Sequence, residues 1–143
     1  MEASLDTSIL VRFATHDVPE QFVLAKALLE RRDIRLVVAD AAWIELAYAL
    51  EHHYAMSRPD VADVITSMAG IESVWTNADT IIAACQAYTS HPTLSFADCY
   101  LASHAHHVDA TPLYTFDKKL ATQHEAAELL RQPASPNQEG ASA

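Results

Sequence analysis

Short apolar stretches alternate with longer amphipathic ones along this chain. The short stretches, typical of buried strands, cover residues 3–5, 35–38, 71–75 and 112–116. The longer ones predict helices over residues 8–14, 19–32, 40–54, 57–70, from 77 or 79 to 89, and 96–107. Strands that alternate with helices predict an α/β fold, here a three-layer α/β/α sandwich with a mainly parallel central sheet.

Helix ends carry their own signals. Asp40 and Ser95 are predicted N-caps, and Gly70 is predicted to close the fourth helix. Residues 121–130 fit either a helix or a short final strand. Beyond them, the Pro, Ser, Gln, Gly and Ala composition predicts a disordered tail. The expected division is one domain over residues 1–132 and a tail over residues 133–143.

Composition narrows the class of protein. The chain has 143 residues, a formal net charge of −10 and only two glycines. The negative charge argues against a broad basic surface for nucleic acid, but it leaves room for a substrate held locally by metal ions and a few basic side chains. No glycine-rich phosphate loop is present, which argues against a nucleotide-dependent kinase or dehydrogenase.

The cysteines and the N-terminus suggest a compartment. Cys85 and Cys99 fall in apolar helical patterns outside any CxxC pair, so two buried, reduced thiols are expected. No secretion signal opens the chain, and no apolar run reaches membrane-spanning length. We therefore expect a cytoplasmic protein with no membrane partner.

Four carboxylates lie in runs that are otherwise almost free of charge: Asp6, Glu45, Asp98 and Asp117. A carboxylate in a core-forming segment loses hydration and must be neutralised, paired or bound to a cation. Two like charges ~4 Å apart repel by about 4 kcal/mol at an effective dielectric near 20. If the four converge, a hard divalent ion such as Mg²⁺ or Mn²⁺ is the simplest counter-charge.

Each carboxylate also has a plainer explanation. Asp6 fits a helix N-cap, Asp98 fits the favourable negative charge of a helix N-terminus, and Asp117 fits a cap or a partner for the lysines that follow it. Glu45 lies inside a helix, where no capping role exists. Asp6 and Asp117 follow strand ends, which is where ligand crevices of parallel sheets form.

The motifs around these acids resemble a known family. Residues 5–11 (LDTSILV), the helix with Glu45, residues 95–98 (SFAD) and residues 114–117 (YTFD) resemble the PIN-domain nucleases, and most of all the VapC-type toxins of bacterial toxin–antitoxin pairs. The likeness extends over residues 3–125. It implies a magnesium-dependent endoribonuclease, with Mn²⁺ as a substitute, that forms a homodimer and is inhibited by a VapB-type antitoxin.

The resemblance also implies roles. All four acids would be catalytic, with Asp6, Asp98 and Asp117 as metal ligands and Glu45 orienting or deprotonating the attacking water. Hydroxyl residues that support the acids in similar proteins correspond to Thr7 and Thr115.

Three basic side chains are candidates for RNA-phosphate contacts: Arg12, Lys118 and Lys119. The resemblance also implies that the second helix and the Glu45 helix form a groove for an antitoxin helix.

Two other functions remain open from the residues alone. A phosphoacceptor receiver-like signalling domain has the same α/β plan, but it leaves Glu45 unexplained. A catalytically inactive PIN-like module would only bind a partner. Zinc binding through the eight histidines is disfavoured because neither cysteine lies near the His52-His53 pair or the 104–107 cluster.

Overall fold

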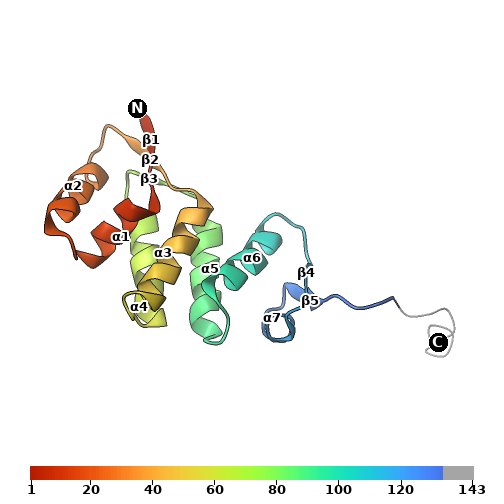
Figure 1. Ribbon diagram of the computed structural model, residues 1–143. Helices are drawn as coiled ribbons and strands as arrows, with labels where there is room; N and C mark the ends of the chain where they lie inside the picture. Colours follow the sequence, from red (N-terminus) through yellow and green to blue (C-terminus); the bar gives the residue numbers. More distant parts are fainter. Residues whose placement is uncertain (134–143) are drawn as a thin grey trace, which may run out of the picture.

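The computed structural model describes residues 1–133 (Figure 1). Its strands are β1 (Glu2–Ser4), β2 (Arg35–Val37), β3 (Val74–Trp75), β4 (Leu113–Thr115) and β5 (Ala127–Leu129). Its helices are α1 (Thr7–Thr15), α2 (Pro19–Leu29), α3 (Asp40–His52), α4 (Arg58–Ala69), α5 (Ala78–Ser90), α6 (Phe96–His107) and α7 (Lys118–Gln123). The predicted α/β fold with parallel strands is confirmed.

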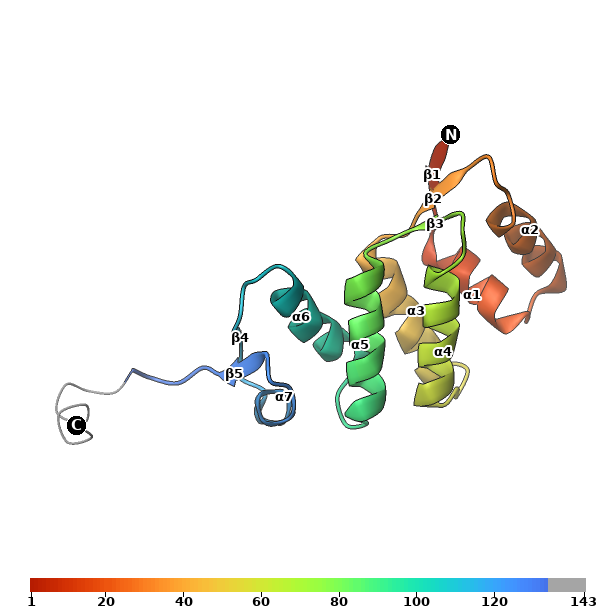
Figure 2. The same ribbon diagram turned by 180° about the vertical axis from the view of Figure 1, so that it is seen from behind.

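The strands form two separate parallel sheets, whereas the sequence suggested one central sheet. The first has the order β1-β2-β3, with Ser4 opposite Val37 and Val37 opposite Trp75. The second pairs β4 with β5, with Thr115 opposite Leu129. Figures 1 and 2 show the two sheets at different ends of an elongated molecule, with α5 and α6 between them.

The first sheet and helices α1 to α5 form what we call the N-terminal body, residues 1–90. Side chains alternate across its strands, so Leu36 and Val74 point into the core while Val37 and Trp75 point outward. The core contains large, fully buried side chains: Trp43, Tyr88, Leu10, Leu36, Leu46, Leu50, Ile65 and Ile81. Burial on this scale is the main source of stability in a small domain.

The C-terminal unit, defined as residues 113–129, consists of β4, α7 and β5. Its buried hydrophobic side chains are Leu120, Ala126 and Ala127, two of which are only methyl groups. Leu113 packs partly against the main core, while Tyr114 and Phe116 remain exposed. This unit therefore has little core of its own.

Arg58 fixes the connection between α5 and α6. Its guanidinium lies 3.7 Å from the centre of the Tyr88 ring and donates hydrogen bonds to the backbone carbonyls of Tyr88, His91 and Leu94. It also forms an ion pair with Glu51 at 3.1 Å. One side chain at the start of α4 thus satisfies carbonyl groups at the end of α5 and in the loop that leads into α6.

Several predicted helix ends are confirmed. Ser95 caps α6 by accepting a hydrogen bond from the Asp98 amide, and Gly70 is the C-cap of α4. Asp40 is not an N-cap. Ala39 occupies that position, while the Asp40 carboxylate accepts hydrogen bonds from the Asn77 amide and the Tyr100 hydroxyl.

Two further differences concern segment length. Helix α2 ends at Leu29, three residues before the predicted end, and the Arg31 amide closes a turn on the Leu28 carbonyl. The ambiguous stretch 121–130 contains both candidates, the end of α7 and then β5. The predicted tail lies almost wholly at 134–143, outside the described residues.

Left-handed backbone angles occur at residues other than glycine. His16, Ala55 and Asp109 have φ values of 56°, 51° and 55°, and Gly70 has a φ of −89°. The low glycine content therefore does not mean that the chain avoids such turns. Among residues 1–133, no helix has both the length and the apolar character needed to cross a lipid bilayer.

Candidate acidic site

Asp6 connects β1 to α1. It is the N-cap of α1, and its Oδ2 accepts hydrogen bonds from the Ser8 amide at 3.1 Å and the Ser8 hydroxyl at 2.6 Å. These two bonds, the hydroxyl bond first, lower the pKa of the Asp6 carboxyl below its ordinary value. The carboxylate is exposed to solvent, so it stays charged at neutral pH while it caps the helix.

Thr7 connects this strand end to Glu45. The Thr7 hydroxyl donates a hydrogen bond of 2.6 Å to Glu45 Oε2, across the contact between α1 and α3. Glu45 lies mid-helix on an exposed face of α3, and the bond turns its carboxylate toward the N-terminus of α1. Asp6 and Glu45 are therefore held on neighbouring elements at the end of β1.

Asp98 occupies the first turn of α6 and is partly exposed. Its carboxylate has no hydrogen-bond partner among residues 1–133. The residues just before it, Ser95 to Ala97, line a small hollow of about 80 Å³ with Ile44 and Tyr48 of α3. The N-terminus of α6 thus lies beside the helix that carries Glu45.

Asp117 lies in the C-terminal unit. It caps α7, because its Oδ1 accepts hydrogen bonds from the amides of Lys119 and Leu120 at 2.9 and 3.2 Å. The Thr115 hydroxyl accepts a bond of 3.0 Å from the Asp117 amide and so steadies the turn. Figures 1 and 2 show this turn far from β1 and α1, where Asp6 lies.

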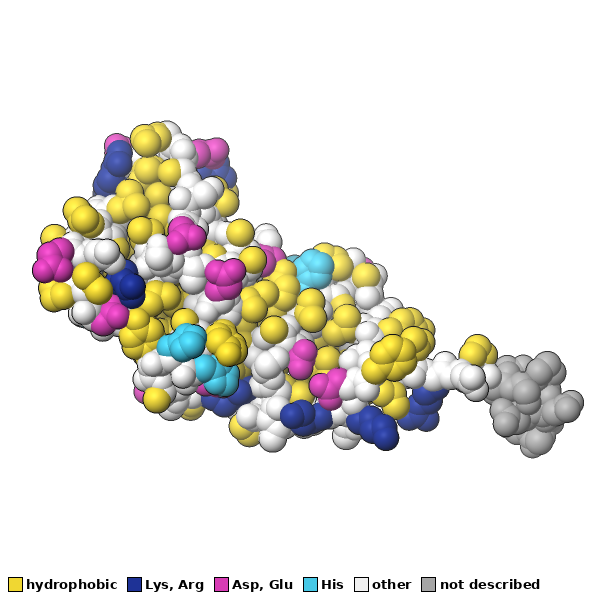
Figure 3. All heavy atoms as spheres, in the orientation of Figure 1, with side chains coloured by type: hydrophobic (Ala, Val, Ile, Leu, Met, Phe, Trp, Pro, Cys, Tyr) yellow, Lys and Arg dark blue, Asp and Glu magenta, His cyan; other side chains and the backbone are white. Residues whose placement is uncertain are grey.

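The prediction that these four carboxylates are buried and lose hydration is wrong. Asp6, Glu45 and Asp117 are exposed and Asp98 is partly exposed, because each lies at a helix start or on an outer helix face. Acidic side chains are accordingly visible on the surface in Figure 3. Residues 1–133 contain no group of three or more His, Cys, Asp or Glu side chains placed to hold one metal ion. The oxygen donors suit Mg²⁺, but this arrangement does not gather them into a site for it.

The basic candidates differ in their availability. Arg12 forms an ion pair with Asp17 at 3.3 Å and donates to Gln21 at 2.8 Å, so its charge is already compensated. Lys118 and Lys119 are exposed at the start of α7. Figure 3 shows basic side chains along the lower edge of this end of the molecule.

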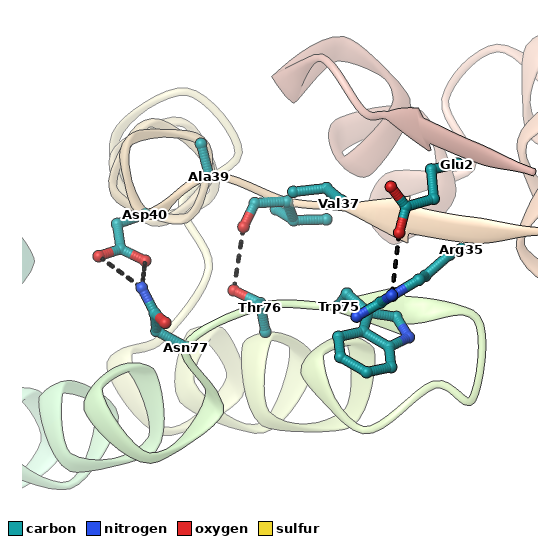
Figure 4. Close-up of a pocket in the computed structure, with 9 residues that line it drawn as sticks. Glu2, Arg35, Val37, Ala39, Asp40, Trp75, Thr76 and Asn77 are labelled. Carbon is teal, nitrogen blue, oxygen red and sulfur yellow. Dashed lines mark hydrogen bonds and ion pairs between the residues drawn. The ribbon is translucent and has the colours of Figure 1, made fainter.

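A groove that the sequence did not reveal lies at the outer face of the first sheet, with a cavity volume of about 500 Å³. The Arg35 guanidinium lies 3.1 Å from the centre of the Trp75 ring and forms an ion pair with Glu2 at 2.9 Å (Figure 4). Asp40 and Asn77 face each other at the other end of the groove. In sequence, the one signal for this groove is that Arg35 and Trp75 each stand next to a buried residue, Leu36 and Val74, and so point to the opposite face of the sheet.

Both thiols are free and buried, as predicted. Burial raises the pKa of each, Cys85 and Cys99, to about 11. A thiol with such a pKa is almost entirely protonated at neutral pH, which argues against a cysteine nucleophile.

Parallel strands joined by helices, with acids at the end of β1 and at the start of α6, define an α/β domain with carboxylates at its strand and helix ends. A family model of the PIN domain matches residues 3–128, and the chain belongs to this family. PIN domains are generally nucleases, which places the protein among the hydrolases at the level of the family. No curated protein matches the chain.

Proposed function

We propose that the protein is an endoribonuclease that hydrolyses RNA phosphodiester bonds. The match of the PIN-domain model to residues 3–128 carries this proposal. The contact between Thr7 and Glu45 supports it, because it holds a second carboxylate on the element next to Asp6. The net charge of −10 makes a locally held RNA more suitable than one bound across a broad surface.

The proposed catalytic residues are Asp6, Glu45, Asp98 and Asp117. Asp6, Asp98 and Asp117 are the proposed ligands of Mg²⁺, with Mn²⁺ as a substitute. Glu45 is the proposed general base or orienting group for water, and the Thr7 hydroxyl restricts its rotamer. Lys118 and Lys119 are proposed to contact RNA phosphates.

We further propose that the nuclease is a VapC-type toxin, active as a homodimer and inhibited by a VapB-type antitoxin. The proposed site for an antitoxin helix is a groove between α1 and α2, whereas the sequence had suggested one between α2 and α3. It has a volume of about 310 Å³ and is lined by Ser8, Ile9, Arg12, Gln21, Leu24, Ala25 and Leu28. Leu24 lines this groove and is exposed, which suits an apolar helix face.

Substitution of the acids tests the activity. Glu45→Gln retains an acceptor for the Thr7 hydroxyl but cannot take up a proton, so RNA cleavage should fall by about 10²- to 10⁴-fold without loss of stability. Asp98→Asn should abolish cleavage. Glu72→Gln and Asp79→Asn, two exposed acids elsewhere, are the matched controls. Undiminished cleavage by Asp98→Asn would contradict the assignment.

Metal addition gives a test that does not require a substrate. Mg²⁺ binding to the folded state should raise the melting temperature. The free energy of unfolding should increase by about 2.7 kcal/mol when the Mg²⁺ concentration is a hundred times the dissociation constant. The Asp6→Asn variant should lose this response. Thermal unfolding with Mg²⁺, with Mn²⁺ and with EDTA measures it.

A catalytically inactive PIN-like module is the second candidate. One observation favours it: within residues 1–133, no three His, Cys, Asp or Glu side chains lie close enough together to bind one metal ion. A folded wild-type protein with neither cleavage nor metal-induced stabilisation would support it. Membership of the PIN family argues against the receiver-like alternative.

A further inference from the structure

Each of the two sheets has open edges. Among the described residues, β1 and β3 are the edge strands of the first sheet, and β4 and β5 are the two edges of the second. Open edges present unpaired backbone groups that can accept another strand. A two-stranded parallel sheet is marginal by itself, because parallel sheets are normally covered on both faces.

Each sheet also has one bare face. On the first sheet, Ala3, Leu36 and Val74 face the helices, while Trp75 is 51% exposed on the opposite face. On the second sheet, Leu113 and Ala127 face inward, whereas Tyr114 is 59% exposed. Phe116, just after β4, is 80% exposed, and Figure 3 shows hydrophobic side chains gathered at this end of the molecule.

Parallel pairing of β1 with β4 in one particular register aligns the acids that follow the two strands. Asp6 and Asp117 each follow the last residue of their strand by two positions, so parallel pairing of Ser4 with Thr115 places the two acids on adjacent strands. Neighbouring strands lie about 4.8 Å apart. This pairing would bring Asp117 to the acids at the end of β1, as a shared site requires.

The same register covers the exposed aromatic side chains. Paired residues of parallel strands point to the same face, so Tyr114 would join Ala3, and Phe116 would join Leu5, on the buried face. Leu113 would lie on the same face as Glu2, so the exposed face of the first sheet would continue into the face of β4 that is partly buried through Leu113.

A second copy of this chain is the partner that requires no movement of α6. Helix α6, which leads into β4, is fixed to the body by the bond from Tyr100 to Asp40 and by the edge contact between Phe96 and Tyr88. With α6 so placed, a chain's own β4 lies far from its own β1 (Figures 1 and 2).

We propose that two copies exchange their C-terminal units, so that β4 of each copy pairs with β1 of the other and Asp117 completes the partner's acidic site. Reciprocal exchange of this kind gives a closed two-fold dimer. The shared site rests on the proposed nuclease function, whereas the strand pairing does not.

A disulfide tests the pairing. The Ser4→Cys/Thr115→Cys variant, oxidised in dilute solution, should form a covalent dimer on a non-reducing gel, because paired positions on adjacent strands suit a disulfide. Cys85 and Cys99 are buried and free, and each single variant is a control. Ser4→Cys/Thr122→Cys, out of register, should not cross-link. A cross-linked monomer of altered mobility, or no disulfide at all, would overturn the exchange.

Complementation tests the shared site. Asp6→Asn and Asp117→Asn should each be inactive, and the two refolded together should recover about a quarter of the wild-type cleavage. Half of the dimers are then mixed, and each of these has one intact site. A mixture that stays inactive while the wild type cleaves would overturn the shared site. A wild type without cleavage would refute the nuclease function, and the disulfide result would still decide the pairing.

Discussion

The N-terminal body and the C-terminal unit are built from the same pattern of strand and helix, yet they differ in how much hydrophobic surface they bury. In the body, the strands and helices enclose large side chains such as Trp43 and Leu46, both fully buried. In the C-terminal unit, Leu120 is the one large hydrophobic side chain that is buried. Stability follows buried apolar area. The same local pattern of strand and helix therefore gives a stable core in the N-terminal body, whereas the C-terminal unit has too little core to be stable by itself.

The largest effect should come from Trp43→Ala in the body. The Trp43 ring is fully buried, and its indole N–H donates a 2.7 Å hydrogen bond to the Thr76 hydroxyl. We expect a loss of about 3–5 kcal/mol in the free energy of unfolding, measured by urea denaturation. Phe116→Ala should cost less than about 0.5 kcal/mol in dilute monomer, since the ring is exposed. Equal losses would contradict the difference between the two regions.

Arg58→Met should have the next largest effect, because Arg58 holds the loop that leads from the body to α6. The substitution breaks the ion pair with Glu51, which keeps the hydrogen bond from the Tyr88 hydroxyl, and removes the guanidinium donor from the carbonyls of Tyr88 and Leu94. A cost of about 2–4 kcal/mol is expected from the broken pair and the carbonyl groups. Lys26→Met, which breaks the exposed pair with Glu30, is the control and should cost about 0.5 kcal/mol or less.

The smallest effect concerns pH at the C-terminal unit. Burial, and then the nearby His91, lower the pKa of His124 below its ordinary value of 6.5. Below that value the unfolded chain takes up a proton that the folded state resists, so stability should fall as the pH drops from 7.5 to 5.5. Protonation also removes the His124 Nδ1 acceptor for the Ala126 amide.

The expected loss is less than about 1 kcal/mol, the worth of one hydrogen bond. Urea midpoints at the two pH values measure it. The pH dependence should diminish in His124→Gln and persist in His107→Gln, an exposed control. A pH dependence that is unchanged in His124→Gln would assign it to other groups.

Much of the fold was predictable because its signals are local. Ser95 and Gly70 mark helix ends through their own backbone and side-chain chemistry, and the strand at 35–37 follows from its apolar content. The role of Asp40 was missed because its partners, Asn77 and Tyr100, are 37 and 60 residues away in sequence. Pairings over such distances leave no pattern in one sequence.

The candidate site was predictable in part for the same reason. The capping roles of Asp6 and Asp117 are local and follow from sequence. Exposure was mispredicted because apolar neighbours on a helix do not fix the face on which Glu45 lies. Whether the four acids meet depends on how the two sheets are arranged, and the helical pattern of α6 does not encode the direction in which β4 leaves it.

The chain leaves α6 through a left-handed turn at Asp109, two residues after the helix ends. Aspartate tolerates a φ of 55°, but a β-branched residue does not, so Asp109→Val would force the chain to leave the helix along another path. Asp109→Gly would accept the same angle and many others. The torsion at Asp109 is therefore one determinant of where β4 lies, and Asp109→Val is expected to change that position.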